Sequence, residues 1–262
     1  MASSSSAAAP PERSIFGWDP RDETASIVGD WIWRYGRGVA DLEIEAKIGR
    51  IIDSHTGERL ALPVASETIL NMQEGWRFES SMSQPQHQQL NNLLNSLVTP
   101  SRRVSYRRVR EIDYAYRNRV RVTRDSDTLA IRQPHGIIRK NRLADMNIYC
   151  PNQGFDFRIS INTETDVDEE PTEESTSHRE KNRLCYTHQG FEVDLTQVTR
   201  PEKPQEPLHE LEVEICDTAA LLRLASAAKS APAANPQEWS DYDDFILVFL
   251  NNVRMLIRQV TP

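Results

Sequence analysis

The stretch that decides the fold reads His209-Glu210-Leu211-Glu212-Val213-Glu214-Ile215. Glutamate alternates with an apolar residue, and successive side chains of a β-strand point to opposite faces. A strand here would therefore place its three carboxylates on one face, with neighbours about 6.8 Å apart. Like charges in such a row repel one another unless cations lie opposite them. The stretch therefore predicts a strand whose charged face meets basic side chains.

Other stretches carry acids and bases in the same alternating pattern. A second glutamate strand, Leu42 to Lys47, places Glu43, Glu45 and Lys47 on one face. Several further predicted strands reserve one face for polar residues: Arg117, Arg119 and Arg121; Lys140 and Arg142; Arg158, Ser160, Asn162 and Glu164; Lys181 and Arg183; Glu192, Asp194 and Thr196. Their opposite faces are mostly apolar, and acids and bases occur in nearly equal numbers.

Period-two alternation extends over most of the chain before residue 216. The predicted strands are 39–52, 103–113, 116–125, 128–132, 136–143, 155–164, 181–188, 190–198 and 208–215. A helix is expected at 84–97, and two more after Asp217 and after Ser240 or Asp241, the last with an apolar stripe of Phe245, Phe249, Val253, Leu256 and Ile257. The Trp-rich residues 12–38 would cover one side of the sheet, 166–179 would form a mobile acidic loop, and 201–207 a second loop.

Each charged face taken alone is typical of a solvated sheet surface, where ion pairs contribute little. Taken together, the faces favour a different arrangement, because apolar outer faces covered by helices would turn the charges inward. A sheet closed in this way is a barrel with a hydrophilic lumen, and paired charges make such a lumen tolerable. We therefore predict an α+β fold: a closed antiparallel eight-stranded β-barrel, or tunnel, with a charged lumen flanked by helices. Residues 12–262 would form one domain, with 217–262 as helices packed on the barrel and 1–11 as a disordered leader.

Composition excludes several other classes of protein. The chain has 262 residues, a net charge of −8 and a sequence pI of about 5.4, which argues against a basic duplex-binding surface. Its three cysteines are sparse and form no zinc-binding spacing with histidine, which favours a reducing compartment. Because no apolar run approaches the length of a bilayer span, no membrane association is expected.

The glutamate motifs and the strands between them resemble the fungal and protozoan RNA triphosphatases of the triphosphate tunnel metalloenzyme superfamily. Besides the two glutamate strands, the resemblance rests on Arg121-Val122-Thr123-Arg124-Asp125, Phe157 to Glu164, Lys181 to Tyr186, Val193 to Val198 and Phe249-Leu250-Asn251-Asn252, which occur in the family order. It covers roughly residues 39 to 258. A lone Glu-x-Glu carries no information, whereas two of them flanking these strands in order are specific.

The resemblance implies roles for individual residues. Glu43, Glu45 and Glu214 would coordinate Mg²⁺ or Mn²⁺, for which carboxylates are suitable hard ligands. The terminal phosphate would be bound by Arg121, Lys181 and Arg183, with Lys140 lining the phosphate path and Glu164 ordering the attacking water. Glu210, Glu212, Asp113 and Asp194 would hold basic side chains and water in place. Glu192, where the yeast-type enzyme has a basic residue, and Ile48, where it has an aromatic one, depart from the family pattern.

The resemblance also implies a function and partners. The activity would be metal-dependent hydrolysis of the γ-phosphate of 5′-triphosphate RNA ends during mRNA capping, with nucleoside triphosphates as further substrates. An RNA guanylyltransferase would be the partner, the chain would form a homodimer, and the setting would be the nucleus. Two alternatives stay open: a related hydrolase of inorganic or thiamine triphosphate, and a non-catalytic module that binds RNA ends.

Overall fold

The structure is a computed structural model that describes residues 14–16, 21–99, 104–230 and 239–260. The leader 1–11 and Trp18 lie outside these residues. The helices are α1 (Glu23–Gly36), α2 (Gln84–Leu97), α3 (Thr218–Ser230) and α4 (Asp241–Arg258). The strands are β1 (Leu42–Asp53), β2 (Thr68–Leu70), β3 (Trp76–Glu79), β4 (Ser105–Ala115), β5 (Val120–Asp125), β6 (Ile137–Tyr149), β7 (Asp156–Asp166), β8 (Ser177–His188), β9 (Phe191–Arg200) and β10 (Lys203–Ile215).

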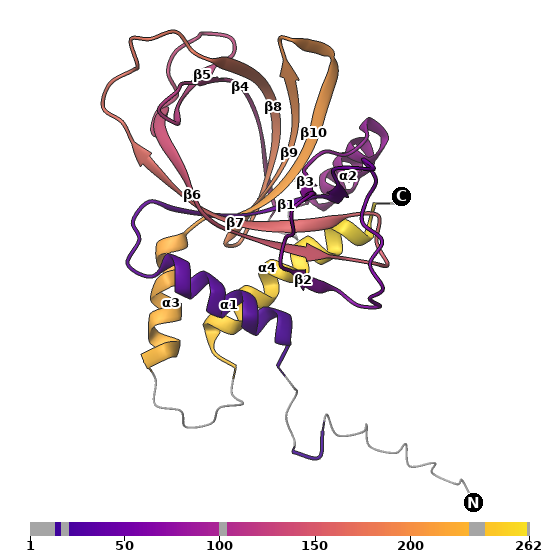
Figure 1. Ribbon diagram of the computed structural model, residues 1–262. Coiled ribbons are helices and arrows are strands. Elements are labelled where there is room, and N and C mark those ends of the chain that lie inside the picture. The colour runs from indigo at the N-terminus through magenta and orange to yellow at the C-terminus, as the bar shows by residue number, and fades with distance from the viewer. Residues whose placement is uncertain (1–13, 17–20, 100–103, 231–238, 261–262) are drawn as a thin grey trace, which may run out of the picture.

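Eight strands form a closed antiparallel barrel, which Figure 1 shows as a ring seen along its opening. The order around the ring is β10-β9-β8-β4-β5-β6-β7-β1, and β1 then pairs with β10. At this last pairing Glu45 lies opposite Glu214, and Lys47 lies opposite Glu212. The structure thus confirms the predicted closed eight-stranded barrel and brings the two glutamate strands side by side.

Helices α1, α3 and α4 pack together against the outside of β1, β7, β9 and β10 (Figure 1). Helix α4 begins at a capping box in which Ser240 and Asp243 bond each other's backbone N–H groups. Its residues Phe249, Val253 and Ile257 are fully buried or nearly so. The prediction of a barrel flanked by helices is confirmed, and the apolar stripe of α4 covers the outer face of the sheet. None of the helices in the described part of the chain is long and apolar enough to cross a bilayer.

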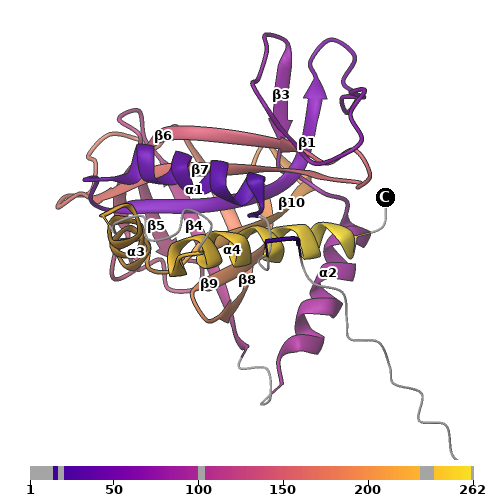
Figure 2. The same ribbon diagram turned by 90° about the horizontal axis from the view of Figure 1, so that it is seen from below.

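Strand β1 continues beyond the barrel and pairs there with β3, so that the two strands stand out as an arm in Figure 2. Gly49 lies where the arm begins. A Cβ atom at this position would lie 2.1 Å from the carbonyl oxygen of Glu79 and 2.7 Å from Cζ of Phe78. Glycine therefore allows β3 to approach β1 closely.

The expectations for secondary structure were wrong in several places. Residues 128–132 are not a strand: Asp125 accepts hydrogen bonds from the backbone and hydroxyl groups of Thr128, which turns the chain outward. Arg117 and Arg119 belong to the β4–β5 turn and do not share a strand face with Arg121. Strand β7 extends to Asp166 and strand β8 begins at Ser177, so the acidic loop between them is shorter than the predicted 166–179. Likewise β10 begins at Lys203, inside the loop expected at 201–207.

Candidate active site

The lumen of the barrel is a cavity of about 520 Å³ lined almost entirely by charged and polar side chains. All eight barrel strands contribute to it. Among the residues assigned a role from the sequence, those that line the cavity are Glu43, Glu45, Arg121, Lys140, Glu164, Lys181, Arg183, Glu210, Glu212 and Glu214. Asp113 and Asp194 lie behind them, buried and bonded to lining residues. The structure therefore brings together every residue that the sequence assigned to the site.

Strands β1 and β10 form an acidic wall, which comprises Glu43, Glu45, Glu210, Glu212 and Glu214. Asn162 holds two of these carboxylates, because its Nδ2 group donates to Glu43 at 2.7 Å and to Glu45 at 3.2 Å. Within the described residues, the carboxylate of Glu214 has no hydrogen bond or ion pair. Burial, and then repulsion from Glu43 and other nearby acids, raises the pKa of Glu214 to about 8. At neutral pH the Glu214 carboxyl group of the acidic wall is therefore largely protonated, and a cation bound beside it would favour its ionised form.

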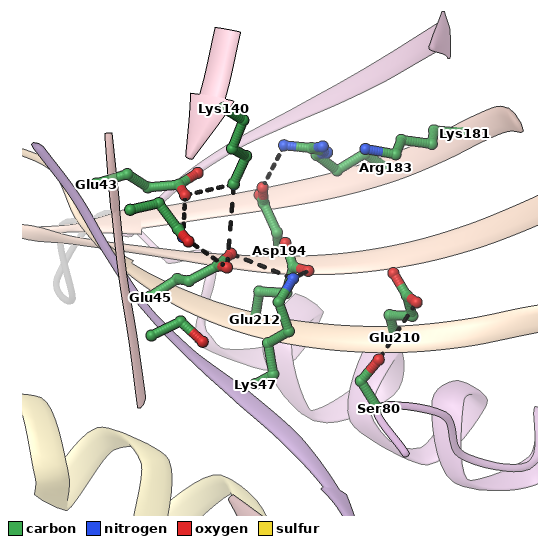
Figure 3. Close-up of polar contacts among 12 residues, drawn as sticks. Glu43, Glu45, Lys47, Ser80, Lys140, Lys181, Arg183, Asp194, Glu210 and Glu212 are labelled. Carbon is green, nitrogen blue, oxygen red and sulfur yellow. Dashed lines mark hydrogen bonds and ion pairs between the residues drawn. The ribbon is translucent and has the colours of Figure 1, made fainter. Parts of the chain in front are cut away.

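Strands β5, β6 and β8 form the opposite, basic wall, which comprises Arg121, Lys140, Lys181 and Arg183. Each of these cations contacts a carboxylate at ion-pair distance: Lys181 Nζ lies 2.6 Å from Asp113, Arg183 Nη1 2.8 Å from Asp194 and Nη2 3.2 Å from Glu111, and Arg121 Nη2 3.1 Å from Glu164. Buried charge is stable only when it is paired in this way. Figure 3 shows Arg183 reaching towards Asp194.

The titration of the buried pairs shows which partner stabilises which charge. Burial alone would raise the pKa of Asp113, but the nearby Lys181 and Arg121 hold it far below its usual range. For Arg183, burial is outweighed by Asp194 and Glu111, and its pKa is raised. The pKa of Lys181 is instead lowered, by burial first and then by the neighbouring cations. Asp113 is thus the carboxylate that lets Lys181 lie buried as an ammonium ion.

Lys140 connects the two walls. Its ammonium group contacts Glu43 on the acidic wall and lies 3.0 Å from Glu164 (Figure 3 shows the Glu43 contact). Burial would raise the pKa of Glu164, but Lys140 and Arg121 lower it. Glu164 is therefore an ionised carboxylate that faces the lumen between two cations.

At the β1–β10 side, Lys47 contacts Glu212 and lies 3.2 Å from Glu45. Its pKa is raised, because the attraction of Glu212 and Glu45 outweighs the effect of burial. Glu210 accepts a long hydrogen bond of 3.4 Å from the Ser80 hydroxyl. Glu212 thus contacts a basic side chain, whereas the hydrogen bond of Glu210 comes from a hydroxyl group, and the roles of both residues stay predictions.

The acidic wall fits a hard divalent cation. Glu43, Glu45 and Glu214 offer carboxylate oxygens from two paired strands, and Glu214 lacks a counter-charge among the described residues. A different group, Cys185, Glu192 and Asp194, has ligand atoms within 4.8 Å of one another. That group suits Mg²⁺ or Mn²⁺ less well, because a thiol is a soft ligand and burial raises the pKa of the Cys185 thiol. The ligand set Glu43, Glu45 and Glu214 stays a prediction supported by this geometry.

The sequence reasoning missed several residues of the lumen. Glu111 is buried, pairs with Arg183 and lies 3.7 Å from Arg132. It shares a strand face with Asp113, so the alternation that identified Asp113 could have identified it too. Phe78 and Ser80 lie in no alternating run of the sequence, so no pattern predicted that the short arm brings them to the cavity. Glu192, the departure noted in the sequence, pairs with Arg107 and accepts a hydrogen bond from Thr187.

Comparison with known proteins places this site in a family. The family model described as "mRNA capping enzyme, beta chain" matches residues 18–262. The mRNA-capping enzyme subunit beta of Cryptococcus neoformans is 34% identical over 96% of this chain, which spans 65% of that relative, slightly less than two thirds. The protein of the same name from Schizosaccharomyces pombe is 33% identical, with coverage of 90% of this chain and 81% of the relative.

A solved structure agrees with these sequence relatives. The S. pombe Pct1 RNA triphosphatase superposes with a TM-score of 0.86 at 32% identity, over 97% of this chain and 100% of that one. The similarity thus extends through the barrel and the helices that cover it. The chain therefore belongs to the family of mRNA capping enzyme beta chains.

Proposed function

We propose that this chain is a metal-dependent RNA 5′-triphosphatase that removes the γ-phosphate from 5′-triphosphate RNA ends and leaves diphosphate ends. The observation that carries the proposal is the meeting of Glu43, Glu45 and Glu214 in a lumen whose opposite wall carries four paired cations. A lumen with both features suits a polyphosphate together with a divalent ion. The name of the S. pombe structure, an RNA triphosphatase, supports the choice of RNA.

In this mechanism the basic wall binds the terminal phosphate. Arg121, Lys181 and Arg183 contact its oxygens and neutralise the negative charge that spreads over them in the transition state. Their guanidinium and ammonium groups are already ordered by Asp113, Asp194 and Glu111. The cations therefore need little rearrangement when the substrate binds.

The nucleophile is a water molecule. Glu164 is ionised and faces the lumen, so its carboxylate can accept a hydrogen bond from that water and direct it at the γ-phosphorus. The water oxygen forms a bond to the γ-phosphorus as the bond to the β–γ bridging oxygen breaks, whose electron pair stays on the diphosphate end of the RNA, and the proton of the water passes to Glu164. Lys140, which lies between Glu164 and Glu43, lines the path of the phosphates.

Glu43, Glu45 and Glu214 would hold Mg²⁺ or Mn²⁺. When bound, such an ion supplies positive charge to the phosphate oxygens. Asn162 orients two of these ligands through its amide group. Hydrogen bonds of this kind fix ligand carboxylates and are part of a metal site.

The test is release of inorganic phosphate from γ-labelled 5′-triphosphate RNA, with and without Mg²⁺. We expect Mg²⁺-dependent release and a 5′-diphosphate RNA product. Inorganic triphosphate and thiamine triphosphate serve as competing substrates, and a clear preference for either would favour a related tunnel phosphatase instead. RNA binding without turnover in Mg²⁺ would favour a non-catalytic module, against which the complete glutamate set argues.

The partners follow from the family. The name "capping enzyme subunit beta" supports an RNA guanylyltransferase as a second subunit, and we extend the proposal to a homodimer that acts in the nucleus. Pct1 has been solved in complex with the Spt5 CTD, which makes that peptide a further partner to test. Size-exclusion chromatography with light scattering, alone and with the guanylyltransferase of the same organism, would test the oligomer and the complex.

A further inference from the structure

One end of the lumen holds two guanidinium groups against a single carboxylate. Nη1 of Arg142 lies 2.6 Å from Asp145, and Nη1 of Arg158 lies 3.9 Å from the other oxygen of the same side chain. The hydroxyl of Ser160 donates to Asp145 at 2.7 Å as well. Asp145 can neutralise one of the two arginines at most, so this end carries surplus positive charge.

The second arginine lies over an aromatic ring. Cζ of Arg158 lies 4.7 Å from the centre of the Phe78 ring, and its Nε group donates to Asn147 at 2.8 Å. Phe78 reaches the lumen because Gly49 lets β3 approach β1 closely. The arm and Asn147 thus position a guanidinium group that also lines the cavity.

Arg158 lies beyond the two β1 carboxylates that would hold the metal. Along the β1–β7 pairing, Asn162 lies opposite Glu43, Ser160 opposite Glu45 and Arg158 opposite Lys47. Arg158 is therefore about 13 Å along the strand from the level of Glu43 and about 7 Å from that of Glu45. A substrate whose γ-phosphate lies between Glu43 and the basic wall would therefore reach Arg158 with a part that follows the scissile bond.

The charge balance elsewhere in the lumen is different. Arg107, which also lines the cavity, has its own carboxylate in Glu192. Burial and the neighbouring Arg142 lower the pKa of Arg158, whereas the carboxylates around Arg183 raise the pKa of that residue. Arg158 is thus less well compensated than Arg183.

We propose that Arg142 and Arg158, the latter lying over Phe78, form a subsite for the nucleotide side of the substrate: the first phosphodiester of single-stranded RNA. A guanidinium group binds phosphate oxygens in two-point fashion, and the RNA chain leaves the lumen past this pair. The inference rests on the proposed triphosphatase function and deepens it. Arg158 is the better residue to test, because Arg142 also donates to Asn162, which holds Glu43 and Glu45.

The experiment compares Arg158→Ala with the wild-type chain on three substrates: 5′-triphosphate RNA, ATP and inorganic triphosphate. We expect kcat/KM for the RNA to fall about tenfold, the size of one charge-assisted contact. The values for ATP and inorganic triphosphate, neither of which contains a phosphodiester, should change less than twofold. A loss for ATP as large as that for RNA would place the contact on the triphosphate and would overturn the subsite.

Two further variants separate charge from geometry. Arg158→Lys keeps the charge but loses the planar fork, and Phe78→Leu keeps the apolar volume but loses the aromatic face. Both should reduce the preference for RNA over inorganic triphosphate less than Arg158→Ala does. Arg110→Ala is the matched control, because Arg110 is also a strand arginine paired with one acid, Asp127, but does not line the lumen. Its kinetics should equal those of the wild type.

Binding distinguishes failure of this inference from failure of the proposed function. Fluorescence anisotropy with labelled 5′-triphosphate RNA, in EDTA and therefore without turnover, should show weaker binding by Arg158→Ala than by Arg110→Ala. Loss of that difference, or an equal loss of activity on all three substrates, would overturn the subsite. If the wild-type chain hydrolyses none of the three, the proposed function fails, while Arg158-dependent RNA binding in EDTA would still support the subsite.

Discussion

The two walls of the lumen carry comparable numbers of ionisable groups but differ in how those groups are paired with partners of opposite charge. On the basic wall, every cation contacts a carboxylate of the protein, and buried groups such as Asp113 stabilise their partners from behind. On the acidic wall, Glu214 has no such partner within the described residues, and its pKa is raised to about 8. The protein thus orders its own cations but leaves a position for an external one. The first two predictions below test this contrast, and the third concerns a buried group outside the lumen.

The largest effect is expected from Glu214→Gln, which removes a carboxyl group that has no counter-charge in the described part of the chain, with little change of shape. Phosphate release should fall by about 10³-fold, since removal of a single electrostatic partner typically costs about 10²–10³ and this carboxyl group is also a proposed metal ligand. Without divalent ions the variant should unfold at a temperature equal to or above that of the wild type, because the amide, unlike the carboxyl group, cannot become an unpaired buried charge.

Thermal unfolding with and without Mg²⁺ or Mn²⁺ completes this test. Divalent ions should raise the unfolding temperature of the wild type and have a much smaller effect on Glu214→Gln, because ligands stabilise the state that binds them. A variant that is destabilised in EDTA and still responds fully to the ion would contradict the contrast between the walls.

Asp113→Asn tests the opposite wall and should chiefly affect stability. It leaves the buried ammonium group of Lys181 without its closest counter-charge, and breaking a buried pair costs about 3 kcal/mol or more. Urea denaturation should show a lower midpoint with an unchanged slope. Glu180→Gln, a change at an exposed acid on the same strand as Lys181, is the control. Equal stability of Asp113→Asn and the control would show that the pairing contributes nothing.

The smallest effect concerns a region outside the lumen. His87 of α2 lies against His209 of β10, with ring centres 4.6 Å apart, and burial followed by repulsion from His209 lowers the pKa of His87 to about 4. The folded chain therefore binds fewer protons than the unfolded chain between about pH 4 and 6.5, and stability falls as the solution is acidified through this range.

His87→Gln should reduce that acid sensitivity by about 1 kcal/mol, allowing for the partial exposure of the ring. The measurement is the difference between urea midpoints at pH 7 and pH 5 for the variant and the wild type. His55→Gln, at an exposed histidine, is the control and should retain the full pH response. A response of His87→Gln as steep as that of the control would refute the prediction.

The sequence allowed the barrel and its charged lumen to be predicted because alternation is a local pattern that survives folding. Glu210, Glu212 and Glu214 remain in step along the whole of their strand, so their common face could be read directly. Strand β6 was predicted too short because its register shifts between Arg142 and Ala144, which breaks the period of two. Helix α1 was missed although Val28, Gly29 and Ile32 follow a helical spacing and Asp22 caps its first turn.

Other features could not be predicted because they depend on pairing between distant segments. The arm that carries Phe78 is short and has no long alternating run, and its position depends on Gly49 of another strand. The charge partners of Lys181 and Arg183 likewise lie on neighbouring strands, and only the register of β4 against β8 selects Asp113 and Glu111. Local patterns therefore indicate the face of each residue but not its partner across the sheet.

The ring of strands is closed by its shortest join between long strands, three residue pairs at which Glu45 meets Glu214 and Lys47 meets Glu212. This seam unites strands near opposite ends of the chain, and two of the three proposed metal ligands face each other across it. A cation bound there would hold strands β1 and β10 together. Metal binding would then also stabilise the closure of the barrel, so the barrel would be most stable in its metal-bound, active form.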